Sequence, residues 1–202
     1  MREVLADRIL RRVLLLAVAL LISGYGALEV GVPIIITVIN GFAVSWVGVS
    51  FAVNTFTIVV VQLLVLRLIW GRSRGLLILA VAGTWATSWI LMGSSLLSQS
   101  TLALVLLAAG IFDLGETLWA PVAPSLVNDL APEQRRGRYN SSMSVEWSLS
   151  SIIGPGIAGL MLAAGREVAS ILVLRAGCTV AAVMAVGLRR VLTAQLDGRT
   201  PG

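Results

Sequence analysis

The chain contains neither histidine nor lysine, and it has a single cysteine. Without lysine it cannot build the phosphate-binding loop of a nucleotide-driven pump, nor a Schiff base. Without histidine it has no Ser-His hydrolase site and no His-ligated zinc or haem. Cys178 has no second cysteine to pair with, so an intrachain disulfide is excluded. These absences exclude most enzyme classes, and the sequence predicts no catalytic residue, no cofactor and no metal site.

Charged residues are also scarce. The 202 residues are 57% hydrophobic and 12% charged, with a mean hydropathy of +0.95, whereas a soluble domain is roughly a quarter charged. All fifteen basic residues are arginine, which leaves a net charge of +5. They form short clusters between apolar runs and no continuous face that could follow a phosphate backbone. The composition indicates an integral membrane protein and excludes a nucleic-acid-binding role.

Several apolar segments are long enough to cross a bilayer, for which a helix needs about 20 residues. The first is too long for the apolar region of a signal peptide, so it counts as a span. The sequence therefore predicts an all-α polytopic membrane protein, with one six-helix transmembrane domain over residues 1–202. The predicted spans are roughly 13–38, 46–66, 76–97, 101–127, 141–163 and 170–188.

The distribution of arginine predicts the orientation, because cytoplasmic segments carry an excess of basic residues. Thirteen arginines lie in the two terminal tails and in the second and fourth connections. The other three connections hold only Arg166, and Arg175 lies inside the sixth span. We therefore expect both termini to be cytoplasmic.

Five ionisable residues fall inside predicted spans: Glu29, Asp113, Glu116, Glu146 and Arg175. A charge costs roughly 2.5–3.5 kcal/mol at the centre of a spanning helix, so such groups usually face a bundle interior or a wet cavity. Asp113 and Glu116 share a helix face at i, i+3, and two such carboxyls should not both be ionised near neutral pH. We predict them as proton carriers, with Glu29 as a further candidate. Alternatively, Glu146 and Arg175 lie near the interface, while Asp113 or Glu116 only pairs with Arg175 or caps a helix break.

Polar and aromatic side chains within the spans are candidates for a substrate cavity. Thr55 and Gln62 share a face of the second span at i, i+7, with Asn54 next to Thr55. Trp85 and Trp89 lie one turn apart in the third span. Ordinary helix packing is the alternative for the polar residues, and the tryptophans could equally face lipid or pack in the core.

The run FDLGETLWAPVAPSLVNDLAPEQRRGRYNSSMSVEWSLSSIIGPGIAG, residues 112–159, resembles the carboxyl-terminal half of major facilitator superfamily transporters, most like the proton-driven drug efflux branch. WGRSRG, residues 70–75, resembles the end of the loop that follows the second helix of each half, with Leu68 where the family has aspartate. The matching elements of the long run are Gly115-Glu116, Pro121, Asp129 to Glu133, Arg136 to Tyr139 and Gly154-Pro155.

This resemblance implies a secondary active transporter, in half or truncated form, in a bacterial inner membrane. The family binds substrate near the midplane between two six-helix halves, and each half is built from inverted three-helix (3+3) repeats. The implied activity is proton-coupled efflux of small amphipathic solutes by alternating access. Six spans form one wall of the cavity, so the expected partner is a separate amino-terminal half, a second copy, or further spans of the same polypeptide.

The resemblance also implies a cytoplasmic charge network that locks one conformation. Asp129 and Glu133 are expected to pair with arginines of the second connection, while Arg136 and Arg138 reach helix ends or partner acids. A purely topogenic loop is the alternative. The expected members are Arg67, Arg72, Arg74, Asp129, Glu133, Arg136 and Arg138.

A different class of function also fits these features. A six-span membrane protein could assemble with a full-length transporter or with itself without moving any solute. Sodium could replace the proton as the coupling ion. An enzyme is the least expected class, since only acid-based intramembrane chemistry could be built from these residues.

Overall fold

The computed structural model describes residues 6–97 and 101–199, which are almost entirely helical and contain no strand. Six stretches of helix in this part are long and apolar enough to cross a membrane. The predicted all-α polytopic fold class is therefore confirmed. The elements are α2 (Arg8–Ser23), α3 (Tyr25–Ile34), the π-helix η1 (Ile35–Ile39), α4 (Ser45–Ile69), α5 (Arg74–Ser95), α6 (Thr101–Leu130), the 3-10 turn η2 (Glu133–Arg135), α7 (Arg136–Ala163) and α8 (Glu167–Arg189).

The first span runs from Arg8 to Ile39 and comprises α2, α3 and η1. It begins five residues before the predicted start at residue 13. Asp7 is the reason, because its carboxylate accepts hydrogen bonds from the backbone N–H groups of Ile9 and Leu10 at 2.9 and 3.1 Å. This N-cap satisfies donors that the first turn leaves without partners, so the helix extends through the arginine-rich tail.

Two interruptions bend the first span. A Cβ atom at Gly24, between α2 and α3, would overlap the ring of Trp85, so only glycine permits this close approach. Pro33 lacks a backbone N–H, and after it the chain continues as the wider turns of η1. The Thr37 hydroxyl donates to the Pro33 carbonyl at 2.7 Å. As a result, α2 packs against α7 and α8, whereas α3 packs against α7 and carries Glu29.

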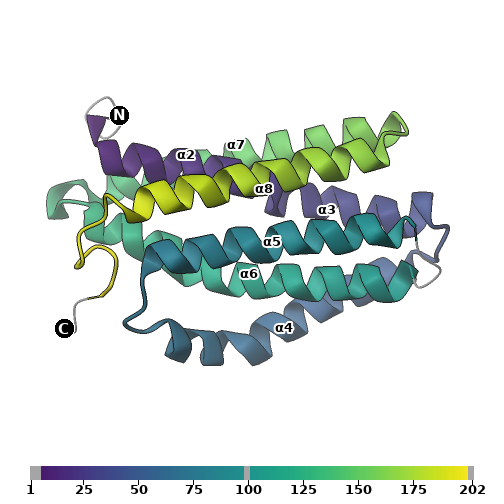
Figure 1. Ribbon diagram of the computed structural model, residues 1–202, viewed down its shortest axis with the longest axis horizontal. Coiled ribbons are helices and arrows are strands. Elements are labelled where there is room, and N and C mark those ends of the chain that lie inside the picture. Colours follow the sequence, from purple (N-terminus) through teal and green to yellow (C-terminus); the bar gives the residue numbers. More distant parts are fainter. Residues whose placement is uncertain (1–5, 98–100, 200–202) are drawn as a thin grey trace.

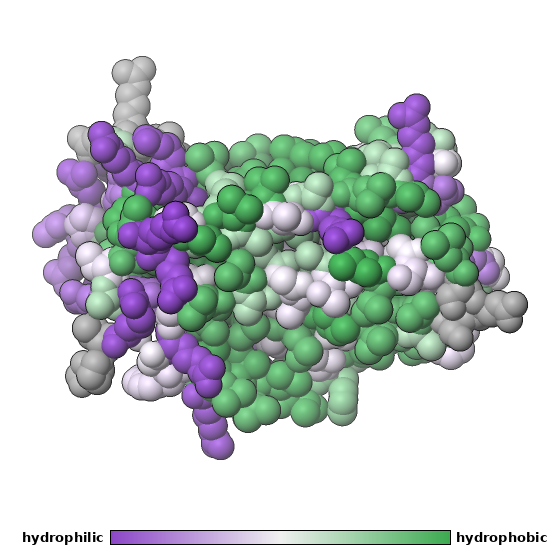
Figure 2. All heavy atoms as spheres, in the orientation of Figure 1, coloured by the Kyte–Doolittle hydropathy of each residue, from purple (hydrophilic) through white to green (hydrophobic). Residues whose placement is uncertain are grey.

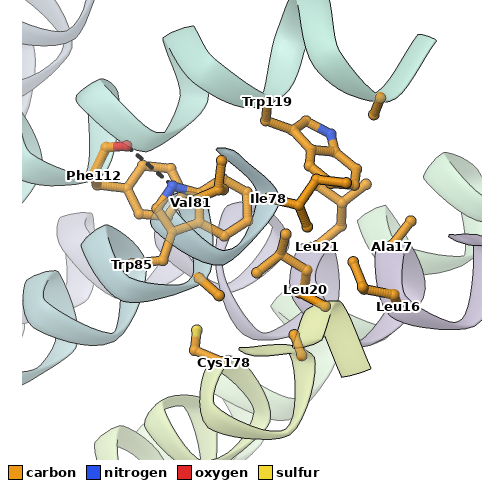
Figure 3. Packing of buried hydrophobic residues seen from close by; sticks show 14 of the residues in the cluster. Leu16, Ala17, Leu20, Leu21, Ile78, Val81, Trp85, Phe112, Trp119 and Cys178 are labelled. Atoms are coloured by element: carbon orange, nitrogen blue, oxygen red, sulfur yellow. Dashed lines mark hydrogen bonds between the residues drawn. The ribbon is translucent and has the colours of Figure 1, made fainter. Parts of the chain in front are cut away.

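Helix α5 lies at the middle of the bundle and packs against α6 on one side and α8 on the other (Figure 1). The Trp85 ring of α5 stacks on Phe112 of α6, with ring centroids 4.5 Å apart, and Cys178 of α8 is buried in the same core (Figure 3). By contrast, α4 lies along one edge and packs mainly against α6. Its apolar side chains, such as Phe56 and Leu63, are therefore largely exposed.

The surface has the distribution expected of a membrane protein. Hydrophilic residues gather at the end of the molecule where α2 begins and α8 ends, and the middle is predominantly hydrophobic (Figure 2). We refer to the former as the arginine-rich end. At 1.5 Å per residue, helices of 22 residues or more are about 33 Å long, enough for a hydrocarbon core of about 30 Å. The chain is an integral membrane protein.

Candidate functional site

Two acids of α6 and one amide of α4 form a partly buried polar cluster. The side-chain N–H groups of Asn54 donate to Asp113 Oδ1 at 2.6 Å and to Glu116 Oε2 at 3.2 Å. Asp113 is completely buried, and its Oδ2 has no hydrogen-bond partner among the described residues. Because α4 makes most of its contacts with α6, this amide is a polar tether between an edge helix and the bundle.

Close packing of α6 on α5 sets the direction of these acids. A Cβ atom at Gly115 would overlap Thr84 and the indole of Trp85, so the two helices approach closely there. The indole N–H of Trp85 donates to the carbonyl of Phe112 at 3.0 Å. Residues 112 and 115 therefore face α5, and the acids, one position or about 100° further round the helix, lie beside this contact. This rotation places Asp113 and Glu116 toward α3 and α4.

The acids line a cavity of about 130 Å³ between α3, α4 and α6, which we call the acid cavity. Glu29 of α3 reaches it as a third carboxyl group, and none of the described residues that line it is basic. Three acids without a cation are unfavourable if all are ionised, so protonation is the simplest compensation. Within the described residues, no group of three His, Cys, Asp or Glu side chains could hold a metal ion. Its lining is Leu28, Glu29, Val32, Ser50, Phe51, Asn54, Ala109, Asp113 and Glu116.

A larger cavity of about 440 Å³, the tryptophan cavity, lies between α2, α5, α6 and α7. Glu116 lines both cavities, whereas Asp113 lines only the acid cavity of the two. Glu146 of α7 lines the tryptophan cavity, is 4% exposed, and has one carboxyl oxygen without a hydrogen-bond partner in the described part of the chain. The lining is Leu21, Trp85, Glu116, Trp119, Ala120, Pro124, Met143, Ser144, Glu146, Trp147 and Ser148.

The sequence analysis does not name Glu146 as a proton carrier, and its alternative places this residue near the membrane interface. The structure places it inside the bundle instead. The predicted span begins at residue 141 and places Glu146 only five residues inside it, whereas α7 begins at Arg136, ten residues before Glu146. At 1.5 Å per residue this is about 15 Å along the helix, close to the middle of a bilayer.

The other cavity candidates have simpler surroundings. Thr55 is exposed, and its hydroxyl donates to the carbonyl of Phe51 at 3.1 Å. Gln62 is half-buried two turns further along α4. Trp85 lines the tryptophan cavity, but both Trp85 and Trp89 are buried packing residues. Asn54, noted in the sequence only as a neighbour of Thr55, is the α4 residue that contacts the acids.

Arg175 is not the partner of either acid. It is exposed on α8, and it lines a groove together with residues of α5. The described residues contain no ion pair between Arg175 and an acidic side chain. The alternative in which Asp113 or Glu116 pairs with Arg175 is therefore wrong.

At the arginine-rich end, Arg74 joins three segments. Its guanidinium forms an ion pair with Asp129 at 2.7 Å and donates to the hydroxyl of Ser125 at 2.8 Å, both on α6. It also donates to the carbonyl of Leu196 at 2.9 Å. Arg74 and Asp129 are both among the residues that the sequence assigned to a charge network. The remaining assigned residues are exposed and take no part in this ion pair: Arg67, Arg72, Glu133, Arg136 and Arg138.

The sequence did not predict that the segment after α8 caps α5. Asp197 is fully buried, and its Oδ1 accepts the backbone N–H of Gly75 at 2.9 Å. Its Oδ2 forms an ion pair with Arg199 at 2.8 Å, and its carbonyl accepts the backbone N–H of Arg74 at 2.9 Å. Ser73 caps the same helix locally, through its hydroxyl and the N–H of Leu76. The first turn of α5 is thus satisfied partly by a residue 122 positions away.

We expect Asp197→Ala to loosen this end, because the N–H of Gly75 loses its buried acceptor. Loss of a helix N-cap or of one buried hydrogen-bond partner costs about 1–2 kcal/mol. Hydrogen exchange of the amides at 74–75 should accelerate accordingly. Asp197→Asn keeps an acceptor oxygen and is the matched control, with a smaller effect. Equal exchange in wild type and Asp197→Ala would show that the cap does not stabilise α5.

A second tether joins the beginnings of α2 and α7. The hydroxyl of Tyr139 donates to Asp7 Oδ2 at 2.9 Å, so one carboxylate both caps α2 and holds α7. Asn140 donates to Asn128 of α6 at 3.0 Å. Tyr139 and Asn140 therefore connect the beginning of α7 to α2 and α6.

Comparison with known proteins gives one similarity. The chain is 28% identical over 141 residues to the uncharacterized MFS-type transporter YdeE of Escherichia coli (strain K12). The match covers 70% of this chain and 35% of the relative, so the chain spans about a third of that protein's length. No protein-family model matches the chain, and no solved structure matches it. This weak homology and the six apolar helices fit one half of a major facilitator transporter.

Proposed function

We propose that the chain is a single six-helix domain forming one half of a major facilitator transporter, which exports small amphipathic solutes in exchange for protons. The observation that carries this proposal is the pairing of buried Asp113 with half-buried Glu116, bridged by Asn54 in a cavity that no basic residue of the described chain lines. Weak homology to an MFS-type transporter supports it. By the arginine distribution, both termini face the cytoplasm of a bacterial inner membrane.

Proton binding acts on the tether between α4 and α6. A hydrogen bond to an ionised carboxylate is roughly twice as strong as one to a neutral group. Asn54 therefore holds α6 more firmly when Asp113 or Glu116 is ionised. Protonation weakens the tether, and α4, whose other contacts are few, is the helix freed to move. Glu29 faces the same cavity and is the entry or exit point for the proton.

The solute binds in the tryptophan cavity. Its volume of about 440 Å³ lies in the range typical of small-molecule sites, and its lining is mostly apolar with a few polar groups. Glu116 lines this cavity and the acid cavity, so solute and proton meet at one side chain. Binding of one opposes binding of the other, which is the requirement for exchange. The second wall is supplied by an amino-terminal half or by a second copy of the chain.

Cells that express the chain together with its partner half, loaded with a fluorescent amphipathic dye, provide the test. We expect dye efflux that stops when a protonophore collapses the proton gradient and that is insensitive to replacement of sodium. Efflux that follows sodium would exclude the proton as the coupling ion. Complete absence of efflux for a broad set of solutes would favour the other class, a six-span protein that assembles with a transporter without moving solute.

The ion pair between Arg74 and Asp129 acts as a cytoplasmic gate in this proposal. Asp129→Asn should shift the balance of inward-open and outward-open states by up to about fivefold, since a partly exposed ion pair contributes up to about 1 kcal/mol. Labelling of cysteines introduced on both sides of the membrane measures the shift, and native Cys178 is buried. Glu133→Gln removes a nearby charge outside the pair and serves as control. Identical labelling of wild type and Asp129→Asn would leave the loop with a topogenic role only.

A further inference from the structure

Arg175 carries an unpaired charge on a face that is otherwise apolar. It lies eight residues after Glu167, the first residue of α8, which is about 12 Å along the helix. The neighbouring exposed side chains of α8, Val168 and Leu172, are apolar and 60% and 55% exposed. In the part of the chain that the structure describes, no acidic side chain forms an ion pair with Arg175. A charge at the centre of a spanning helix costs roughly 2.5–3.5 kcal/mol, and part of that cost applies to Arg175 unless a partner or water compensates it.

A groove of about 230 Å³ between α5 and α8 leads to Arg175. Gly93 of α5 lies in it, and a Cβ atom there would be 3.3 Å from the Ile171 side chain, so the missing side chain makes room. The other walls, including Ile90 and Leu172, are mainly apolar. The groove therefore combines an apolar surface with one cation, and both features must be matched by whatever occupies it.

We propose that this groove, which we call the Arg175 groove, binds an anionic phospholipid. The phosphate pairs with the guanidinium, whose planar fork suits two phosphate oxygens, and an acyl chain lies along the apolar walls. The long arginine stem lies on apolar surface while its head extends toward the interface. Basic pockets between membrane helices on the cytoplasmic side bind lipid head groups, and the Arg175 groove offers the same pairing at the opposite end of the bundle.

Other occupants fit less well. A second copy docking on the same face around a two-fold axis would bring two Arg175 side chains together without an acid to compensate them. A free inorganic anion would match the charge but leave the apolar walls uncovered. A phospholipid matches both the charge of Arg175 and the apolar walls of the groove. Arg175 lies 14 residues before Arg189, the last residue of α8, so the lipid belongs to the leaflet remote from the arginine-rich end, about 21 Å along the helix. The inference is independent of the transport proposal.

Native mass spectrometry and thermal unfolding of the purified chain in neutral detergent micelles test the proposal. We expect phosphatidylglycerol to bind and raise the unfolding temperature, and phosphatidylcholine and inorganic phosphate to do neither. Arg175→Gln should weaken phosphatidylglycerol binding by about tenfold or more, since a charged hydrogen bond is lost. Arg166→Gln removes an exposed arginine outside the groove at the same end of α8 and should leave binding unchanged.

Three results would overturn the proposal. The first is equal binding of phosphatidylglycerol and phosphatidylcholine, and the second is equal weakening by Arg175→Gln and Arg166→Gln, which would indicate general electrostatics. The third is efficient crosslinking between copies through Leu172→Cys, which would make the groove a contact between chains. Arg175→Lys keeps the charge without the fork and should retain part of the binding, which shows that loss in Arg175→Gln is not a failure to fold.

Discussion

Asp113→Asn is expected to abolish proton-driven efflux while leaving the protein folded and inserted. Asparagine has the same shape and retains an oxygen to accept the hydrogen bond from Asn54, but it cannot take up and release a proton. Loss of a positioned proton-transfer group typically costs 10²–10⁴ in rate, so we expect a decrease of about 100-fold or more. Dye efflux driven by an imposed pH gradient in liposomes is the appropriate measurement.

Thr117→Val provides the matched control for this variant. Thr117 is also buried on α6, one turn after Asp113, and its hydroxyl donates only to the carbonyl of Leu114 in the same helix. Its replacement should leave efflux close to wild type. Comparable losses in Asp113→Asn and Thr117→Val would point to general disturbance of α6. Undiminished proton-driven efflux in Asp113→Asn would remove this residue from the mechanism.

Glu116→Gln is expected to separate solute movement from proton movement. Glu116 is the residue shared by the two cavities, and glutamine preserves its size and an acceptor for Asn54. Solute binding should lose its dependence on pH, and downhill solute flux should persist without proton countertransport. Uphill efflux should fall by about 100-fold or more, as for the loss of any positioned proton carrier.

Glu146→Gln is the informative comparison, because Glu146 lines the tryptophan cavity and not the acid cavity. It should alter the affinity for solute and preserve the ratio of protons to solutes. Asp113→Asn should change the ratio of protons to solutes and preserve the affinity for solute. If Glu116→Gln and Glu146→Gln have the same effect on coupling, Glu116 is not the point at which solute and proton compete.

Hydropathy predicted the spans well because a membrane imposes a simple requirement on the backbone, whose polar groups must be paired within helices. The ends of the spans depend on particular capping residues. The cap at Asp7 moved the start of the first span outward by five residues, from the predicted residue 13 to Arg8. Local sequence contains this signal, but only in the arrangement of an acid before a helical turn, which average hydropathy does not detect.

The candidate site was predictable only on one helix. The spacing of Asp113 and Glu116 placed them together on α6 whatever the tertiary structure. The rotation of α4 was not predictable, because its apolar residues surround it on nearly all sides and no stripe marks the buried face. For this reason the sequence predicted Thr55 and Gln62 as the cavity residues of α4. The residue that contacts the two acids of α6 is Asn54, which is adjacent to Thr55.

Long-range contacts at the arginine-rich end were predictable only in part. The pairing of Asp129 with an arginine of the second connection followed from the family resemblance, and Arg74 forms it. Nothing near Asp197 in the sequence indicates that it reaches the start of α5. The places of the two tryptophans could not be predicted for a different reason, because an indole ring can both pack in a core and donate one hydrogen bond. Sequence alone does not distinguish the buried positions of Trp85 and Trp89 from cavity positions.

The most direct test of the central claim is proton flux driven by a solute gradient. The assembly that contains this chain is reconstituted in liposomes with an internal pH indicator, and an amphipathic solute that it exports is added on one side. We predict movement of protons opposite to the solute for wild type, and solute movement without proton movement for Glu116→Gln. Solute transport by wild type without any accompanying proton movement would contradict the assignment of Asp113 and Glu116 as proton carriers.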